Sequence, residues 1–176
     1  MHGVRRELLA AQAQALDLPV YEVWIPQAAS DAVYEQRMGA AVQRMVSDGI
    51  EAVAFGDLFL EDVRAYREKM MAPTGLEPLF PLWGAPTAAL ARRIIADGFR
   101  AVLACVDPRA VPAEFAGREY DEALLDEMPA EADPCAERGE FHTFVYDAPN
   151  FASTIAIRRG EVVEREGFIF ADLLPA

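Results

Sequence analysis

Basic residues are scarce in this sequence of 176 residues: 16 Lys and Arg stand against 29 Asp and Glu, so the formal net charge is −13. A surface with this charge repels polyanions, which argues against general nucleic-acid binding. Cysteine is also rare, with Cys105 and Cys135 as the only two. Because a chain this apolar can stabilise itself by core packing, we expect both thiols to be reduced.

Long apolar segments are missing as well. No run approaches the roughly 18 residues that cross a bilayer, and the first residues do not form a signal-like apolar stretch. We therefore expect a cytoplasmic protein that does not contact membranes. Hydrophobic residues make up 53% of the chain and charged residues 26%, which is typical of a globular protein with a sizeable core.

Three common catalytic motifs are absent. The sequence contains no Gly-x-Ser-x-Gly, no Walker-type glycine-rich loop and no Gly-x-Gly-x-x-Gly after an apolar run. Hydrolase, kinase and dehydrogenase functions therefore have no support from motifs.

Helices and strands alternate over the first hundred residues. The apolar pattern predicts helices at 5–16, 32–47, 60–71 and 88–96, and strands at 20–25, 50–55, 77–83 and 99–106. Strands 50–55 and 99–106 are apolar almost throughout, as parallel strands buried on both faces are. We expect an α/β fold, with a parallel sheet covered by helices on both faces.

The pattern changes beyond Asp107. A proline-rich stretch leads to one acidic helix, and short strands follow, two of them joined by a predicted hairpin turn at 158–160. The helix is expected at 120–128 and the strands at 140–146, 154–157, 161–165 and 168–170. We divide the chain into an α/β domain at 1–84 and a smaller mixed α+β region at 85–176.

Polar residues after a strand are the first candidates for a ligand site, because ligands bind at the carboxyl ends of parallel strands. Gly56 and Asp57 follow strand 50–55; the glycine lets the backbone approach a ligand, and the carboxylate can bind a ribose hydroxyl, a metal or an amine. A plain strand-to-helix turn explains them equally well. Arg64 and Arg67 on the next helix could clamp a carboxylate or phosphate, or could be solvated helix charges.

The densest polar cluster is Glu137-Arg138-Gly139-Glu140-Phe141-His142-Thr143. It combines acids, a base, a glycine and a hydroxyl, but its spacing matches no generic metal site. On its own the segment fits either an ordinary loop or a functional site. His2 could contact an active site or simply begin a helix.

Taken together, several segments resemble the diphthine–ammonia ligase family of adenine nucleotide alpha hydrolases, the PP-loop ATP pyrophosphatases. These segments are residues 2–5 with the helix that follows, 55–58, 64–68, 82–84, and above all 133–135 with 139–143. Glu137, Gly139, Glu140 and Thr143 fit the family's C-terminal signature. Arg138 replaces a glycine and His142 replaces the last acid, and these departures favour a bacterial-type member.

The resemblance implies a Rossmann-like, HUP-type parallel sheet that is N-terminally incomplete. The Ser-Gly-Gly-x-Asp-Ser phosphate loop of such proteins is absent from the sequence, together with about 40 to 45 residues if loops have ordinary lengths. The expectation is either a misplaced start codon or a truncated relative. A shortened sheet would expose an edge and apolar surface, so we expect a homo-oligomer or low stability.

The resemblance also implies a reaction. ATP, with Mg²⁺, adenylylates a carboxylate of a small molecule or protein, and ammonia then displaces AMP to leave an amide. Residues 1–84 would form the PP-loop ATPase-type nucleotide domain and 85–176 the substrate-recognition domain. The implied roles are catalytic for Gly139, Glu140 and Thr143, cofactor-binding for His2, Gly56 and Asp57, and substrate-binding for Arg64, Arg67, Glu137 and His142.

Two other functions stay open at this point. The missing phosphate loop favours a non-catalytic module that binds a nucleotide or small acid, or that self-associates. His142, Glu137 and Glu140 could instead serve a metal-dependent hydrolase. Whether the substrate is diphthine is a separate question.

Overall fold

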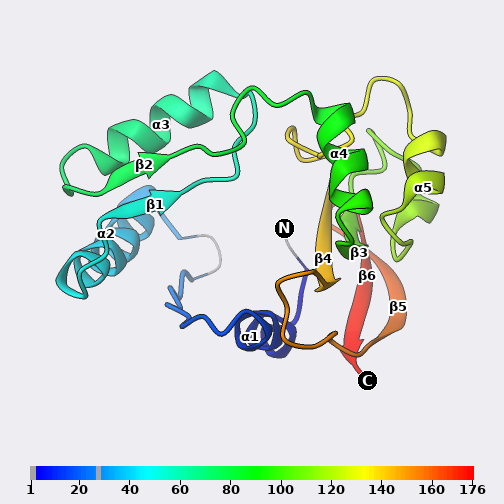
Figure 1. Ribbon diagram of the computed structural model, residues 1–176, viewed down its shortest axis with the longest axis horizontal. Helices are drawn as coiled ribbons and strands as arrows, with labels where there is room; N and C mark the ends of the chain where they lie inside the picture. Colours follow the sequence, from blue (N-terminus) through cyan, green and yellow to red (C-terminus); the bar gives the residue numbers. More distant parts are fainter. Residues whose placement is uncertain (1–2, 27–28) are drawn as a thin grey trace. The chain divides into compact units, whose positions relative to one another are not determined.

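A computed structural model describes residues 3–26 and 29–176 (Figure 1). Its α-helices are α1 (Arg6–Ala15), α2 (Asp31–Ser47), α3 (Glu61–Met71), α4 (Thr87–Ala96) and α5 (Glu122–Glu127), and a 3₁₀ turn covers Ala113–Phe115. Its strands are β1 (Ala52–Ala54), β2 (Glu77–Leu79), β3 (Arg100–Val106), β4 (Phe141–Asp147), β5 (Ile157–Arg165) and β6 (Phe168–Pro175). His2, a predicted cofactor-binding residue, lies outside the described residues.

Internal contacts divide the chain into two compact units. Val20–Ala85 form one, called here the β1–β2 unit, and the residues up to Pro19 join Pro86–Ala176 in the other, the C-terminal unit. Helix α1 therefore packs with the C-terminal unit, although it precedes the β1–β2 unit in sequence. The functional division into 1–84 and 85–176 stays a prediction.

The β1–β2 unit contains a parallel pair of strands joined by α3. Ala52 lies opposite Glu77 and Ala54 opposite Leu79, which is the parallel pairing expected of a strand-helix-strand segment. The alternating pattern thus predicted a mixed α/β protein, but a complete Rossmann-like sheet is not present among the described residues.

Three predictions for this unit are wrong in whole or in part, and one of them is strand 77–83, which ends at Leu79 as β2. Residues 20–25 form no strand, because no described segment pairs with them, and Trp24 is 64% exposed. Strand 50–55 shortens to β1, which is not buried on both faces. In the described structure β1 pairs only with β2, so the sheet is too narrow to enclose it.

The C-terminal unit contains an antiparallel sheet with the strand order β4-β3-β6-β5. The parallel direction predicted for strand 99–106 is therefore wrong, since β3 runs antiparallel to both β4 and β6. Its burial was correctly predicted, because Ala101 to Val106 are all buried. Burial on both faces requires covering elements on both sides of the sheet but does not fix the strand direction.

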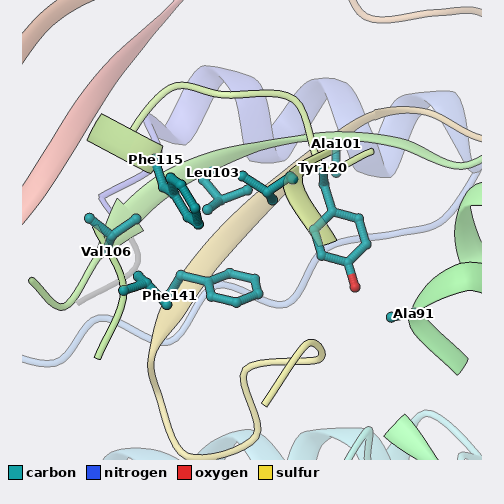
Figure 2. Close-up of a cluster of buried hydrophobic side chains, with 9 residues drawn as sticks. Ala91, Ala101, Leu103, Val106, Phe115, Tyr120 and Phe141 are labelled. Carbon is teal, nitrogen blue, oxygen red and sulfur yellow. The ribbon is translucent and has the colours of Figure 1, made fainter. Parts of the chain in front are cut away.

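Helices cover both faces of this sheet. Ala101 and Leu103 of β3 share a buried cluster with residues of α4 and α5, whereas Val102 and Ala104 share one with Leu8 of α1. Figure 2 shows the first cluster, in which the ring centroids of Tyr120 and Phe141 lie 6.1 Å apart. This alternation is the period of two expected of a strand between two layers.

A β-bulge interrupts the alternation near the end of β3. The register with β4 shifts between Leu103 and Cys105, which leaves one extra residue on β3. After the shift Val106 packs in the same cluster as Leu103. The bulge therefore changes the face of the sheet toward which the last side chains of β3 point, just before the loop that begins at Asp107.

The hairpin turn predicted at 158–160 is also wrong. These residues lie inside β5, and a Cβ on Gly160 would lie 3.1 Å from the carbonyl oxygen of Asp172. Gly160 thus allows close approach of the two strands. The turn comes at Glu166 and Gly167, with φ values of 53° and 80°, as expected for a tight two-residue hairpin.

We expect Gly167→Ala to lower the free energy of unfolding by about 1 kcal/mol, because a Cβ disfavours the left-handed conformation. Gly39, in the middle of α2, has no atom near its Cβ position. Gly39→Ala should therefore raise stability by about 0.5–1 kcal/mol through helix propensity. Urea unfolding of the two variants measures both signs, and equal effects would contradict the assignment of the turn.

No helix in the described part of the chain is long and apolar enough to cross a membrane.

Candidate functional site

Two buried carboxylates organise residues 133–140, which we call the 133–140 loop. The Glu140 carboxylate accepts hydrogen bonds from the backbone N–H of Asp133 at 2.9 Å and of Arg138 at 3.1 Å. Asp133 in turn accepts from the backbone N–H of Glu137 at 2.8 Å. Asp133 and Glu140 are 4% and 5% exposed, so each carboxylate is buried but hydrogen-bonded. Glu140 therefore holds the conformation of the loop by accepting hydrogen bonds from its backbone.

The loop is hydrogen-bonded to the end of β3, one of the two inner strands of the sheet. The backbone N–H of Asp107, at the end of β3, donates to the carbonyl of Glu140 at 2.8 Å. Gly139 has a φ of +84°, a left-handed conformation that favours glycine, and no atom lies near its Cβ position. The structure thus brings Glu137, Gly139 and Glu140 together in one ordered loop.

Thr143 and His142, the last two predicted site residues of this segment, lie on β4. Neighbouring residues of the strand mark its two faces: Phe141 packs in the cluster with α4 and α5, and Phe144 in the cluster with α1. Side chains alternate along a strand, so Thr143 faces the side of Phe141 and His142 the side of Phe144. The structure therefore separates these two residues from each other.

A polar pocket of about 560 Å³ lies beside the 133–140 loop. Gly139, Glu140 and Arg138 line it, together with Asp107, Arg109 and residues of the segment 129–132. The Arg109 side chain donates three hydrogen bonds to the Asp107 carboxylate: Nε to Oδ1 at 2.8 Å and to Oδ2 at 3.2 Å, and Nη2 to Oδ2 at 2.6 Å. These bonds hold the pKa of Asp107 below its usual value.

Asp107 and Arg109 were missed by the sequence analysis. The signal that could have found them is their position, because they directly follow the most apolar strand of the chain. They line the same pocket as Glu140 because the chain returns beside β3 at β4, a long-range contact that sequence spacing does not show.

The other predicted site residues lie in the β1–β2 unit. Gly56 and Asp57 follow β1, and Arg64 and Arg67 lie on α3. Arg67 Nε is 3.6 Å from Asp57 Oδ2, and both atoms are buried without a hydrogen-bond partner. Arg64 Nε donates to Glu68 Oε1 at 2.8 Å. The structure thus brings Asp57 and Arg67 together.

Cys135 of the 133–140 loop is a partly buried free thiol. Its Sγ donates to the carbonyl of Thr87 at 3.4 Å. Burial, and then the negative charges of Asp133 and Glu137, raise its pKa to about 11. Cys105 is 1% exposed, burial raises its pKa as well, and neither cysteine forms a disulfide.

A raised pKa keeps the Cys135 thiol protonated at neutral pH, and the thiolate is the reactive form. We expect iodoacetamide to alkylate Cys135 about 100-fold more slowly than free cysteine at pH 8, with a rate that rises with pH up to about pH 11. Mass spectrometry of the alkylated peptide between pH 7 and 10 measures this. A rate close to that of free cysteine at pH 8 would show instead an activated thiol.

Among residues 3–26 and 29–176, no three His, Cys, Asp or Glu side chains form a group that could hold a metal ion.

Most of the C-terminal unit matches a known protein family in sequence. Residues 86–172 match the family model of the diphthamide synthase C-terminal domain, and this range includes the 133–140 loop, its pocket and β4. Over 177 residues the chain is 24% identical to the diphthine–ammonia ligase of Schizosaccharomyces pombe. The chain is diphthine–ammonia ligase-like.

Two vertebrate diphthine–ammonia ligases are also similar to the chain in sequence. The human enzyme is 26% identical over 174 residues, which cover 90% of this chain, and the Danio rerio enzyme is 30% identical over 127 residues, which cover 69%. The matched residues span 29% of the S. pombe enzyme, 65% of the human enzyme and 50% of the D. rerio enzyme. This diphthine–ammonia ligase-like chain thus spans less than two thirds of the length of these relatives.

Proposed function

We propose that this protein takes part in the ATP-dependent amidation of a carboxylate, with diphthine as the first candidate substrate. The similarity to diphthine–ammonia ligases over 90% of the chain carries the proposal. In the reaction a carboxylate oxygen attacks the α-phosphorus of ATP, and pyrophosphate leaves. Ammonia then attacks the acyl carbon, AMP leaves with the electron pair of the broken C–O bond, and the nitrogen loses a proton to leave a neutral amide.

The C-terminal unit is assigned to recognition of the carboxylate substrate and ammonia. The order of the 133–140 loop supports this assignment, since buried hydrogen bonds hold Glu140 and Gly139 at the wall of a polar pocket. Preorganised backbone is what a site needs to orient two reactants. We assign Glu140 and Gly139 to positioning within this site. Glu137, Thr143 and His142 are not among the residues that line the pocket, and because Thr143 and His142 face opposite sides of β4, only one of these two can contact the same substrate.

The β1–β2 unit is assigned to the nucleotide. Gly56 and Asp57 lie at the carboxyl end of β1, the end of a parallel strand at which ligands bind. Mg²⁺ bound with ATP takes only one or two protein carboxylates. Asp57 is the carboxylate that we assign to it, although its buried Oδ2 lies 3.6 Å from Arg67 Nε and would have to exchange this ion pair for the metal.

Ammonium-dependent release of AMP tests the proposal. The purified chain is incubated with ATP, Mg²⁺ and a protein that carries diphthine, and AMP is measured with and without ammonium. AMP that forms only when all components are present supports amidation. No AMP under any combination would favour the non-catalytic binding module for this chain.

A further inference from the structure

Two loops meet at the carboxyl end of the β1–β2 sheet. Phe55 and Asp57 lie just after β1, and residues 80–83 lie just after β2. The backbone N–H of Gly84 donates to the carbonyl of Leu58 at 2.8 Å, which joins the two loops. Ligands of parallel sheets bind at this end, so the side chains gathered here are candidates for contact with a ligand.

Aromatic rings from both loops contact two arginines of α3. The guanidinium carbon of Arg64 lies 4.7 Å from the ring centroids of both Phe80 and Trp83. The guanidinium carbon of Arg67 lies 5.2 Å from the centroid of Phe55. Phe55 and Phe80 stack on each other with centroids 5.5 Å apart and an angle of 25° between the rings. The rings therefore restrict the orientation of both guanidinium groups.

Both arginines keep unused donors. Arg64 uses Nε for Glu68, and no described residue accepts a hydrogen bond from its two Nη atoms. Arg67 donates to no described residue, and its buried Nε is an orphaned donor beside the orphaned Oδ2 of Asp57. Each arginine side chain is 36% exposed, so a ligand can reach it. Arg67 Nε already faces the Asp57 carboxylate at 3.6 Å, so the Nη atoms of the two arginines are the donors left for a ligand.

Two guanidinium groups one helical turn apart suit a ligand with two neighbouring anionic groups. Residues at i and i+3 have Cβ atoms about 5–6 Å apart on a helix. Guanidinium groups bind phosphate with paired N–H donors, and a phosphoanhydride presents two phosphates joined by one oxygen.

We propose that Arg64 and Arg67 bind the two phosphates of a phosphoanhydride, with Phe55, Phe80 and Trp83 as positioning residues. The choice of phosphate over carboxylate rests on the proposed function, in which pyrophosphate is a product. The arrangement of the rings and arginines does not depend on that function.

Binding of inorganic pyrophosphate tests this site without turnover. Trp24 and Trp83 are the two tryptophans, so Trp24→Phe leaves Trp83 as the fluorescent reporter. Pyrophosphate is titrated into this variant of the full chain with Mg²⁺ held constant, and calorimetry repeats the titration on the unmodified chain. We expect pyrophosphate to change Trp83 fluorescence and to bind more tightly than phosphate or acetate.

Arg64→Gln and Arg67→Gln should each weaken pyrophosphate binding at least tenfold. Arg44→Gln is the matched control, because Arg44 belongs to the same unit, lies over the ring of Tyr21 at 5.1 Å and pairs with Asp48. Its affinity should stay unchanged. Circular dichroism of each variant separates loss of the site from loss of the fold.

The role of the rings has its own test. Trp83→Phe keeps an aromatic face for Arg64 and should retain affinity by calorimetry, whereas Trp83→Leu should lose about tenfold. Equal losses in the two variants would overturn the positioning role.

Failure of this proposal is distinguishable from failure of the proposed function. No binding of pyrophosphate at millimolar concentration, an affinity that Arg64→Gln and Arg67→Gln leave unchanged from the unmodified chain, or tighter binding of acetate would each overturn the site. If pyrophosphate binds as expected but ammonium-dependent AMP is not formed, the site stands and the amidation proposal falls.

Discussion

Glu140→Ala is expected to lower the free energy of unfolding of the C-terminal unit by about 3 kcal/mol. The substitution removes the acceptor of two backbone N–H groups, those of Asp133 and Arg138, in a loop where Glu140 is 5% exposed. Hydrogen bonds to a charged acceptor contribute about 1.5–3 kcal/mol each, and a buried donor left without a partner costs about 1–3 kcal/mol. Urea unfolding followed by circular dichroism measures the change.

The same substitution should lower amide formation more than about 100-fold, because displacement of a site by about 1 Å can cost a factor of that size. Glu140→Gln keeps the side-chain volume and one acceptor oxygen, so we expect an intermediate loss of stability. Glu114→Ala removes an exposed carboxylate of the same unit and should change stability by less than about 0.5 kcal/mol. If Glu140→Ala unfolds like the unmodified chain, the 133–140 loop does not depend on this carboxylate.

Leu8→Ala is expected to lower the stability of the C-terminal unit by about 3 kcal/mol. Leu8 on α1 is 1% exposed and packs in the cluster that contains Val102, Phe144 and Leu173 of the sheet. Removal of a buried leucine side chain loses its transfer free energy and leaves a cavity. Hydrogen exchange of the amides of β3 and β6 measures the effect on this unit.

Leu9 provides the matched control for this prediction. It is the next residue of the same helix, and it is 52% exposed. Leu9→Ala should change amide protection by less than about 0.5 kcal/mol. If both variants leave the protection of β3 and β6 unchanged, α1 does not stabilise the C-terminal unit, and the division of the chain into two units is wrong at this point.

Local sequence patterns predicted where strands lie better than they predicted which strands pair with each other. The apolar run at 99–106 correctly indicated a buried strand, but the same run fits a parallel and an antiparallel neighbour equally well, and β3 has antiparallel neighbours. The β-branched run at 20–25 has the composition of a strand, but a strand forms only where another segment accepts its backbone hydrogen bonds. Pairing depends on residues far away in sequence, which periodicity does not encode.

Glycine gave a second kind of error. Arg-Arg-Gly at 158–160 has the composition of a turn, yet Gly160 serves close approach to β6, and the turn uses Glu166 and Gly167. One glycine can permit a left-handed backbone or leave room for a neighbour, and sequence alone does not separate these two uses.

The sequence singled out some residues of the candidate site, but it missed Asp107 and Arg109, which line the same pocket, and the site roles stay predictions. Glu140 and Gly139 stood out as a polar cluster before a strand, but the internal hydrogen bonds of Glu140 are visible only in the structure. Arg64 and Arg67 stood out as a pair on a helix. Their contacts with Phe55, Phe80 and Trp83 depend on how the loops after β1 and β2 meet.

Transfer of labelled nitrogen tests the central proposal most directly. The chain is incubated with ATP, Mg²⁺, ¹⁵N-ammonium and a protein that carries diphthine, and the product is analysed by mass spectrometry while AMP is measured in parallel. Our account predicts one ¹⁵N-amide per AMP formed, with both products reduced together in Glu140→Ala. AMP without labelled amide, or labelled amide without ATP, would contradict it.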